Sequence, residues 1–268
     1  MVTPPILDNK RASSKSLFSP SALLREARRQ KGLAEVAAPR VCIFDPDGDL
    51  ARRLRETGAS KPFEPWPCYH TDLDTFQLGG RRVGVIGRVV GASFAVLVAE
   101  ELFASGCGLL VSLTSAGQIT HCGEPPYFVV IDRALRDEGT SYHYAPPSEF
   151  ADADPGLVKT AAAALSEIGP RCVVGASWTT DAPFRETSEA IEAARDKGIL
   201  AVEMEAAALY TFARTAGVRI LCLAHVTNTM GLAGDDFEKG EEDGTRDALA
   251  VLEATIAALA PSDAEALD

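Results

Sequence analysis

The fold is decided by residues 200–210, which read Leu-Ala-Val-Glu-Met-Glu-Ala-Ala-Ala-Leu-Tyr. An apolar run at 200–202 is followed at once by helical periodicity over 203–216, so this stretch predicts a strand that leads directly into a helix. The same alternation recurs on both sides of it. We predict strands at 41–44, 83–86, 109–113, 127–131, 171–174, 200–202 and 219–224, and helices at 94–104, 156–168, 187–196, 203–216 and 245–260.

Strands that are apolar throughout and separated by helices indicate a sheet covered on both faces. We therefore predict an α/β fold in a single domain, with a mixed central β-sheet flanked by helices on both faces. A chain of 268 residues is compatible with one domain. Residues 1–39 are rich in Ser, Lys, Arg and Pro, and we expect them to form an N-terminal arm that precedes a globular domain at 40–268.

Composition excludes several classes of protein. With 46% hydrophobic residues the chain can build a core, and its net charge of −12 argues against a nucleic-acid surface, which needs clustered Lys and Arg. Six cysteines without a CxxC pair indicate a reduced, cytoplasmic protein with no metal site. The apolar run at 94–99 ends at Glu100 and Glu101, too short to span a membrane, and we expect neither a membrane partner nor a signal peptide.

Function is expected in the loops that follow the carboxyl ends of the strands. Glu203 and Glu205 stand two residues apart where a predicted strand becomes a helix, so they cannot share one helix face. One can point into a cleft while the other braces backbone, and a carboxylate that accepts from two vicinal hydroxyls can hold a sugar. The alternative is a solvated pair that interacts favourably with the helix dipole.

Residues 202–210 resemble the ribose-binding signature of the nucleoside phosphorylase family, which includes uridine phosphorylase, hexameric purine nucleoside phosphorylase and the methylthioadenosine nucleosidases. The pattern can be followed over residues 41–259. Residues 136–144 (Arg-Asp-Glu-Gly-Thr-Ser-Tyr-His-Tyr) and 177–187 resemble a branch of the family with the same order of motifs. The resemblance implies a nucleoside phosphorylase-like fold for 40–268.

A ribose site is implied by the same resemblance. Met204 would pack under the sugar, Glu205 would accept from the 2′ and 3′ hydroxyls, and Glu203 would support them. A site built to hydrogen-bond a hydroxyl discriminates against a substrate that lacks it, because its buried polar groups are left unpaired. We therefore expect ribonucleosides to be preferred over 2′-deoxyribonucleosides.

The phosphate site departs from the family pattern. Residues 48–52 (Gly-Asp-Leu-Ala-Arg) resemble the family's Gly-Asp-Pro-x-Arg loop, which assigns phosphate binding to Gly48 and Arg52. This chain has Ser112 at the position of the family's second arginine, so the arginine is absent. Ser115 keeps the hydroxyl group of that motif. Arg88, which follows the strand predicted at 83–86, is expected to compensate, the alternative being an ordinary surface arginine. Because arginines are missing, hydrolysis becomes a credible rival to phosphorolysis.

The base site rests on two loops. Purine-specific members of the family carry an Asp where this chain has Asn228, and an amide cannot act as a general acid. Either Asn228 stabilises a departing purine less well than an Asp would, or the substrate is a pyrimidine nucleoside. The alternative is that Asn228 only forms a turn and has no contact with a ligand. Trp178, Asp181 and Arg185, in the loop at 177–187, are further candidates for base binding.

The resemblance thus implies an enzyme of nucleoside salvage, a pentosyltransferase that cleaves the N-glycosidic bond of a ribonucleoside with phosphate as the attacking group. Glu205, Asn228 and Arg52 are the expected catalytic residues. A pyrimidine nucleoside such as uridine is slightly favoured over a purine nucleoside. Hydrolysis by water and a non-catalytic nucleoside-binding protein are the alternatives. We expect no metal or organic cofactor, phosphate as co-substrate, and a homo-oligomer, either hexamer or dimer.

Overall fold

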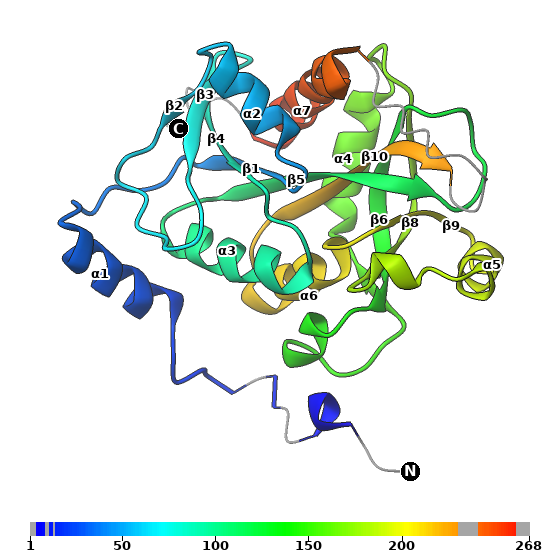
Figure 1. Ribbon diagram of the computed structural model, residues 1–268, viewed down its shortest axis with the longest axis horizontal. Helices are drawn as coiled ribbons and strands as arrows, with labels where there is room; N and C mark the ends of the chain where they lie inside the picture. The colour runs from blue at the N-terminus through cyan, green and yellow to red at the C-terminus, as the bar shows by residue number, and fades with distance from the viewer. Residues whose placement is uncertain (1–3, 9–10, 13, 230–240, 261–268) are drawn as a thin grey trace.

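The computed structural model describes residues 4–8, 11–12, 14–229 and 241–260 (Figure 1). The strands among them are β1 Val41–Asp45, β2 Lys61–Pro62, β3 Asp74–Leu78, β4 Arg81–Gly87, β5 Leu109–Gln118, β6 Tyr127–Asp137, β7 Phe150–Asp152, β8 Cys172–Thr180, β9 Ile199–Glu203 and β10 Ile220–Thr229. The α-helices are α1 Pro20–Lys31, α2 Asp49–Glu56, α3 Ala92–Ala104, α4 Pro155–Leu165, α5 Ser188–Asp196, α6 Ala206–Ala216 and α7 Thr245–Leu259. Short 3-10 turns occur at Pro5–Leu7, Thr140–His143, Pro183–Arg185 and Glu241–Gly244.

All described strands belong to one mixed sheet. Its order is β10-β6-β8-β9-β5-β1-β4-β3-β2, with β7 added beside β6. Because β10 also pairs with β5, the strands β10, β6, β8, β9 and β5 close into a ring, and β1, β4, β3 and β2 extend the sheet beyond it. The predicted mixed sheet is therefore confirmed, with a partial closure that the sequence did not indicate.

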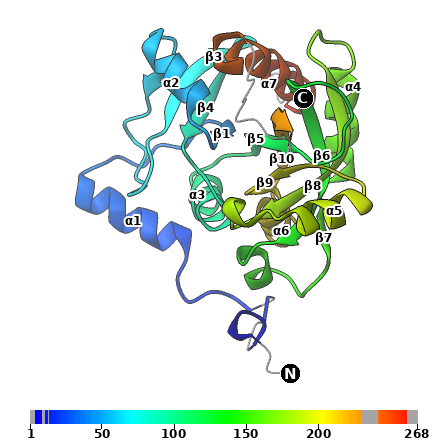
Figure 2. The same ribbon diagram turned by 45° about the vertical axis from the view of Figure 1, so that its right-hand side comes forward.

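Helices cover both faces of the sheet, as predicted. Cys42 and Phe44 of β1 belong to the core shared with α3 and α6, whereas Val41 and Ile43 face the core shared with α2, α4 and α7. In Figure 1 α3 and α6 lie below the sheet, and α2 and α7 lie above it. A third, smaller core packs α5 against β8 and β9 (Figure 2).

Every predicted strand and helix is present, and the helix ends shift by at most three residues. The strands β5, β6, β8 and β10 run five or six residues farther than predicted, so Ser115, Trp178 and Asn228 lie on strands and not in loops. The helix predicted from 203 begins at Ala206, so that Glu203 is the last residue of β9. The strands β2, β3 and β7 and the helix α2 were not predicted, because they are short or strongly charged. The resemblance placed residues 48–52 in a loop, which is wrong after Gly48, because Asp49 begins α2 and Arg52 lies on this helix.

Part of the predicted arm packs on the domain. The Ser19 hydroxyl accepts a hydrogen bond from the Ala22 backbone N–H, Pro20 starts α1, and Gly32 ends it with φ 67°. Leu24 and Ala27 of this helix are buried. None of the described helices is long and apolar enough to cross a membrane.

Candidate active site

The carboxyl ends of parallel strands meet at one edge of the sheet. β1 pairs in parallel with β4 and β5, and β5 pairs in parallel with β10. Phe44 and Cys222 both lie opposite Ser112, so β5 and β10 continue past the end of β1. The loops after β1 and β4 therefore lie beside the last residues of β5 and β10, where ligands bind in open α/β sheets.

Glu203 is a bracing carboxylate. Its Oε1 accepts hydrogen bonds from the Ser177 hydroxyl at 2.9 Å and the Thr179 hydroxyl at 2.5 Å. Its Oε2 accepts from the backbone N–H groups of Glu205 and Ala206, each at 2.7 Å. Four protein donors thus occupy Glu203, which holds the first turn of α6 in place. This position fits support of the site better than direct contact with a sugar.

Glu205 is the carboxylate with capacity for a ligand. Its side chain is 2% exposed, and its Oε1 accepts from the Gly91 backbone N–H at 2.7 Å. Its buried Oε2 has no hydrogen-bond partner among the described residues. Burial raises the pKa of Glu205 above its ordinary value, and the charge of Glu203 raises it further. A buried acceptor without a protein partner is costly unless a ligand supplies the donor. Met204, between the two carboxylates, is half-buried.

Three of the predicted phosphate-binding residues come together. Gly48, Arg52 and Arg88 line one cavity of about 310 Å³ beside the loop that also carries Gly91. Gly48 has φ 82°, and a Cβ there would lie 2.8 Å from Cγ of Arg88, so the Arg88 side chain crosses directly over it. Arg88 itself has φ 64°, a conformation that is uncommon outside glycine and frequent at functional sites. Its backbone N–H donates to the Asp45 carbonyl at 2.9 Å.

Arg52 and Arg88, which both line this cavity, differ in the ion pairs that they form. Arg52 forms ion pairs with Asp49 at 3.1 Å and Glu56 at 3.5 Å. The Arg88 guanidinium has no ion pair among the described residues. Arg88 is therefore the cation better placed to receive an anion.

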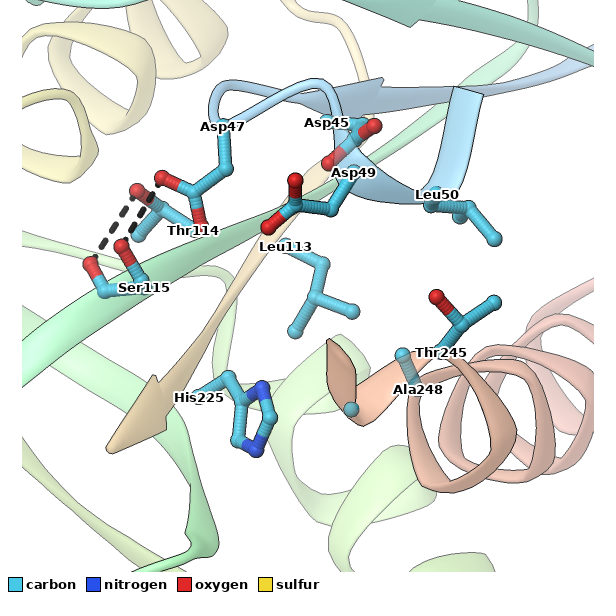
Figure 3. A pocket seen from close by; sticks show the side chains of 11 residues that line it. Asp45, Asp47, Asp49, Leu50, Leu113, Thr114, Ser115, His225, Thr245 and Ala248 are labelled. Atoms are coloured by element: carbon cyan, nitrogen blue, oxygen red, sulfur yellow. Dashed lines mark hydrogen bonds between the residues drawn. The ribbon is translucent and has the colours of Figure 1, made fainter. Parts of the chain in front are cut away.

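Ser115 does not line the cavity that holds these arginines. It lines a second, smaller cavity of about 30 Å³, together with Asp45, Asp47 and Asp49 (Figure 3). Its hydroxyl donates to Oδ1 of Asp47 at 2.8 Å. Burial raises the pKa of Asp45 to about 7, the hydrogen bond from the Ala51 backbone opposes the rise, and the charge of Asp47 adds to it. The surroundings of Ser115 are acidic, which disfavours phosphate at that point.

The predicted base-binding residues differ in burial and in their partners. Trp178 is buried in the core under α5 and donates from Nε1 to Asp137 at 3.0 Å, which argues against contact with a ligand. Asp181 accepts from the Gly139 backbone at 2.7 Å, and Arg185 is exposed. Asn228 is half-buried near the end of β10, opposite Gly117 of β5.

Sequence reasoning passed over three residues of this region. Phe184 is 98% exposed in the turn after β8, the strand that supplies two donors to Glu203. An exposed ring in the segment that follows β8 is a candidate contact for a planar base. Asp47 and Gly91 were also missed as partners of Ser115 and Glu205. The Asp residues at every second position from 45 to 49 could have pointed to Asp47 in the sequence. No sequence pattern distinguished Phe184 from an aromatic residue of the core.

The family model of the phosphorylase superfamily matches residues 40–259. The chain belongs to this superfamily. The match includes both carboxylates of the β9–α6 junction and the residues that follow β1, β4, β8 and β10 in the sequence. The resemblance seen in residues 202–210 is thereby confirmed.

The chain is similar to nucleoside phosphorylases of known sequence or structure. A DeoD-type purine nucleoside phosphorylase from Bacillus cereus (strain ZK / E33L) is 32% identical over 151 residues, which are 56% of this chain and 64% of that protein. The chain thus spans less than two thirds of the length of this relative and of the other DeoD-type purine nucleoside phosphorylases that it matches. A uridine phosphorylase structure from Vibrio fischeri ES114 has a TM-score of 0.66 at 21% identity, covering 85% of this chain and 93% of that one.

A purine nucleoside phosphorylase from Toxoplasma gondii, in complex with immucillin-H, superposes with a TM-score of 0.73 at 15% identity. The superposition covers 85% of this chain and 94% of that chain. Both structural neighbours share the fold of this chain, and the predicted nucleoside phosphorylase-like fold is confirmed.

Proposed function

We propose that the chain cleaves the N-glycosidic bond of a ribonucleoside. The observation that carries this proposal is Glu205, a buried carboxylate with one oxygen held by Gly91 and the other without a hydrogen-bond partner among the described residues. Two vicinal ribose hydroxyls are the donors that would complete it. Glu203, fully occupied by protein donors, keeps the backbone of Glu205 in place.

Phosphate is the attacking group that we propose first. The cavity of about 310 Å³ offers Arg88, Arg52 and the left-handed backbone of Gly48. Arginine suits phosphate because its planar guanidinium can donate two parallel hydrogen bonds. Arg88 and Gly91 belong to one loop, only three residues apart, so their Cα atoms lie within about 11 Å of each other. An anion bound by Arg88 would therefore lie near the carboxylate of Glu205. The curated relatives are named as phosphorylases, which supports this choice.

For the base we propose a pyrimidine such as uracil. Asn228 can donate a hydrogen bond to a carbonyl oxygen of a departing base but cannot protonate N7 of a purine. Phe184 would supply a ring for stacking. The relatives include both uridine and purine nucleoside phosphorylases, so the choice of base rests on Asn228 and not on them.

The test is base release by the purified protein from uridine, inosine and adenosine, with phosphate, following the free base and the sugar product. We expect base together with ribose 1-phosphate, and a larger kcat/KM for uridine than for inosine. Glu205→Gln should lower kcat/KM by 10-fold or more, because a neutral amide accepts weaker hydrogen bonds than a carboxylate. Glu192→Gln, at an exposed position on α5, serves as the matched control. Absence of base release from all three nucleosides would contradict the proposal.

A further inference from the structure

The helix α1 lies outside the residues that match the phosphorylase superfamily. The match begins at residue 40, whereas α1 covers Pro20–Lys31. The helix packs beside α3 (Figure 1), and its last residues form hydrogen bonds with the connection between β2 and β3. We call residues 66–72 of this connection the wall segment. An element outside the family match is thus in direct contact with a segment inside it.

Two side chains at the end of α1 bind the wall segment. The Lys31 ammonium donates hydrogen bonds to the backbone carbonyls of Pro67 at 2.9 Å and Cys68 at 2.6 Å. The same ammonium lies 4.9 Å from the ring centre of Tyr69, and the Tyr69 hydroxyl donates to Oε1 of Gln30 at 2.9 Å. Hydrogen bonds from a charged donor are stronger than those between neutral groups. Lys31 is therefore the main attachment of the wall segment to α1.

The wall segment is also held together by its own hydrogen bonds. The Thr71 hydroxyl donates to the Cys68 sulfur at 3.4 Å and accepts from Nε1 of Trp66 at 3.1 Å. The His70 backbone N–H donates to the same sulfur at 3.3 Å. Trp66 and Cys68 are both buried. The position that Lys31 gives to Cys68 therefore also fixes His70 and Thr71.

The wall segment lines the cavity proposed for phosphate. It contributes His70, Thr71 and Asp72 to the same cavity of about 310 Å³ that Arg88 lines. The His70 ring lies edge-on to the Phe94 ring of α3, with the ring centres 6.5 Å apart. A wall that keeps water out of a cavity strengthens the attraction between a guanidinium and an anion, because water screens charges. The affinity for phosphate should therefore depend on where the wall segment lies.

We propose that Lys31 is a positioning residue for the phosphate site, and that α1 is a part of this site that the family match does not include. Because it uses the cavity assigned to phosphate, this inference rests on the proposed function. Lys31 does not itself line the cavity, so it acts through the backbone of the wall segment. Without the ammonium, the wall segment occupies its position for a smaller fraction of the time. The apparent Kd for phosphate then rises as the inverse of that fraction.

The experiment measures phosphate binding and base release with the full chain. Inorganic phosphate is titrated calorimetrically into wild type and each variant, and initial rates with uridine and inosine give kcat and the KM values for phosphate and nucleoside. Lys31→Ala should raise both the Kd and the KM for phosphate about 5- to 10-fold, if the placed fraction falls to about 10–20%. The KM for nucleoside should change less than about twofold, because the Glu205 carboxylate is held by Gly91 and not by the wall segment.

Three further variants separate positioning from stability. Lys31→Arg should regain most of the affinity for phosphate, because a guanidinium can still donate to the two carbonyls. Gln30→Ala, which removes the partner of the Tyr69 hydroxyl, should raise the Kd for phosphate about twofold and serves as a second variant if Lys31→Ala does not fold. Arg29→Ala is the matched control, because it removes one charge from the same turn of α1 and Arg29 is 69% exposed and paired with Glu26. Circular dichroism and thermal unfolding establish that each variant is folded.

Three results would overturn the inference. If wild type releases base with phosphate but Lys31→Ala keeps the Kd and KM of wild type for phosphate, Lys31 has no positioning role and the proposed function stands. If Lys31→Ala raises the KM for nucleoside as much as that for phosphate, or if Arg29→Ala has the same effect, α1 acts on stability and not on the phosphate site. If wild type does not bind phosphate in the titration, there is no phosphate site for Lys31 to position. A wild type that binds phosphate but releases no base contradicts the proposed function alone, and the Kd values of the variants still test Lys31.

Discussion

Removal of the Glu203 carboxylate should destabilise the chain by an amount that the geometry defines. Glu203→Ala leaves two buried backbone N–H groups, those of Glu205 and Ala206, without their acceptor. The hydroxyls of Ser177 and Thr179 can rotate toward other acceptors, but a backbone N–H cannot. Each unsatisfied donor costs about 1–3 kcal/mol, so we expect a loss of about 2–6 kcal/mol in the free energy of unfolding, before any cavity cost.

Glu203→Gln provides the matched comparison. Its amide oxygen can still accept from both backbone N–H groups, while its NH2 group turns to the two hydroxyls, which can also accept hydrogen bonds. The expected loss is about 1 kcal/mol. Urea unfolding of wild type and both variants, at one pH and with m-values compared, measures the difference. The reasoning would be refuted by an Ala variant within 1 kcal/mol of wild type, or by a Gln variant as unstable as the Ala variant.

Three other substitutions test the surroundings of the site. The pKa of Asp45 is about 7 in the folded chain and about 4 in an unfolded one, so the folded chain binds a proton between these values and its stability falls as pH rises from 4 to 7. The Asp45→Asn variant lacks this pH dependence. Its free energy of unfolding, measured with urea, should therefore rise relative to that of wild type by up to about 4 kcal/mol between pH 4 and pH 8. A difference between the two proteins that does not change with pH would contradict this. Gly48→Ala should cost about 1–2 kcal/mol, because its φ of 82° is left-handed, and calorimetry would detect it; an unchanged melting temperature would show that the loop relaxes. Arg88→Ala should raise the KM for phosphate about 10- to 100-fold through the loss of charged hydrogen bonds, and initial rates at varied phosphate check this; an unchanged KM would place phosphate elsewhere.

The buried parts of the fold were predictable from sequence because their apolar runs are uninterrupted. The strand β1 was found for this reason, whereas the helix α7, whose apolar residues alternate with polar ones, was found from its helical periodicity. The helix α2 was not, because its sequence Asp-Leu-Ala-Arg-Arg-Leu-Arg-Glu shows few apolar residues. That omission placed Arg52 in a loop, whereas the helix pairs it with Asp49 and Glu56.

The sequence indicated which residues belong to the site, but it did not show which role each of them has. The spacing of Glu203 and Glu205 indicated that one braces and one binds, but the donors that occupy Glu203 come from Ser177 and Thr179 on another strand. Likewise, the contact of Ser115 with Asp47 joins residues 68 positions apart. Such contacts depend on strand register, which a single sequence does not contain.

The central claim is that Glu205 accepts hydrogen bonds from the ribose hydroxyls of a nucleoside substrate. The most direct measurement is the ratio of kcat/KM for uridine and 2′-deoxyuridine, each assayed with wild type and with Glu205→Gln in the presence of phosphate. The account predicts that wild type prefers uridine by 10-fold or more, since one charged hydrogen bond contributes about 1.5–3 kcal/mol, and that the variant loses most of this preference. Equal turnover of the two nucleosides by wild type would contradict it.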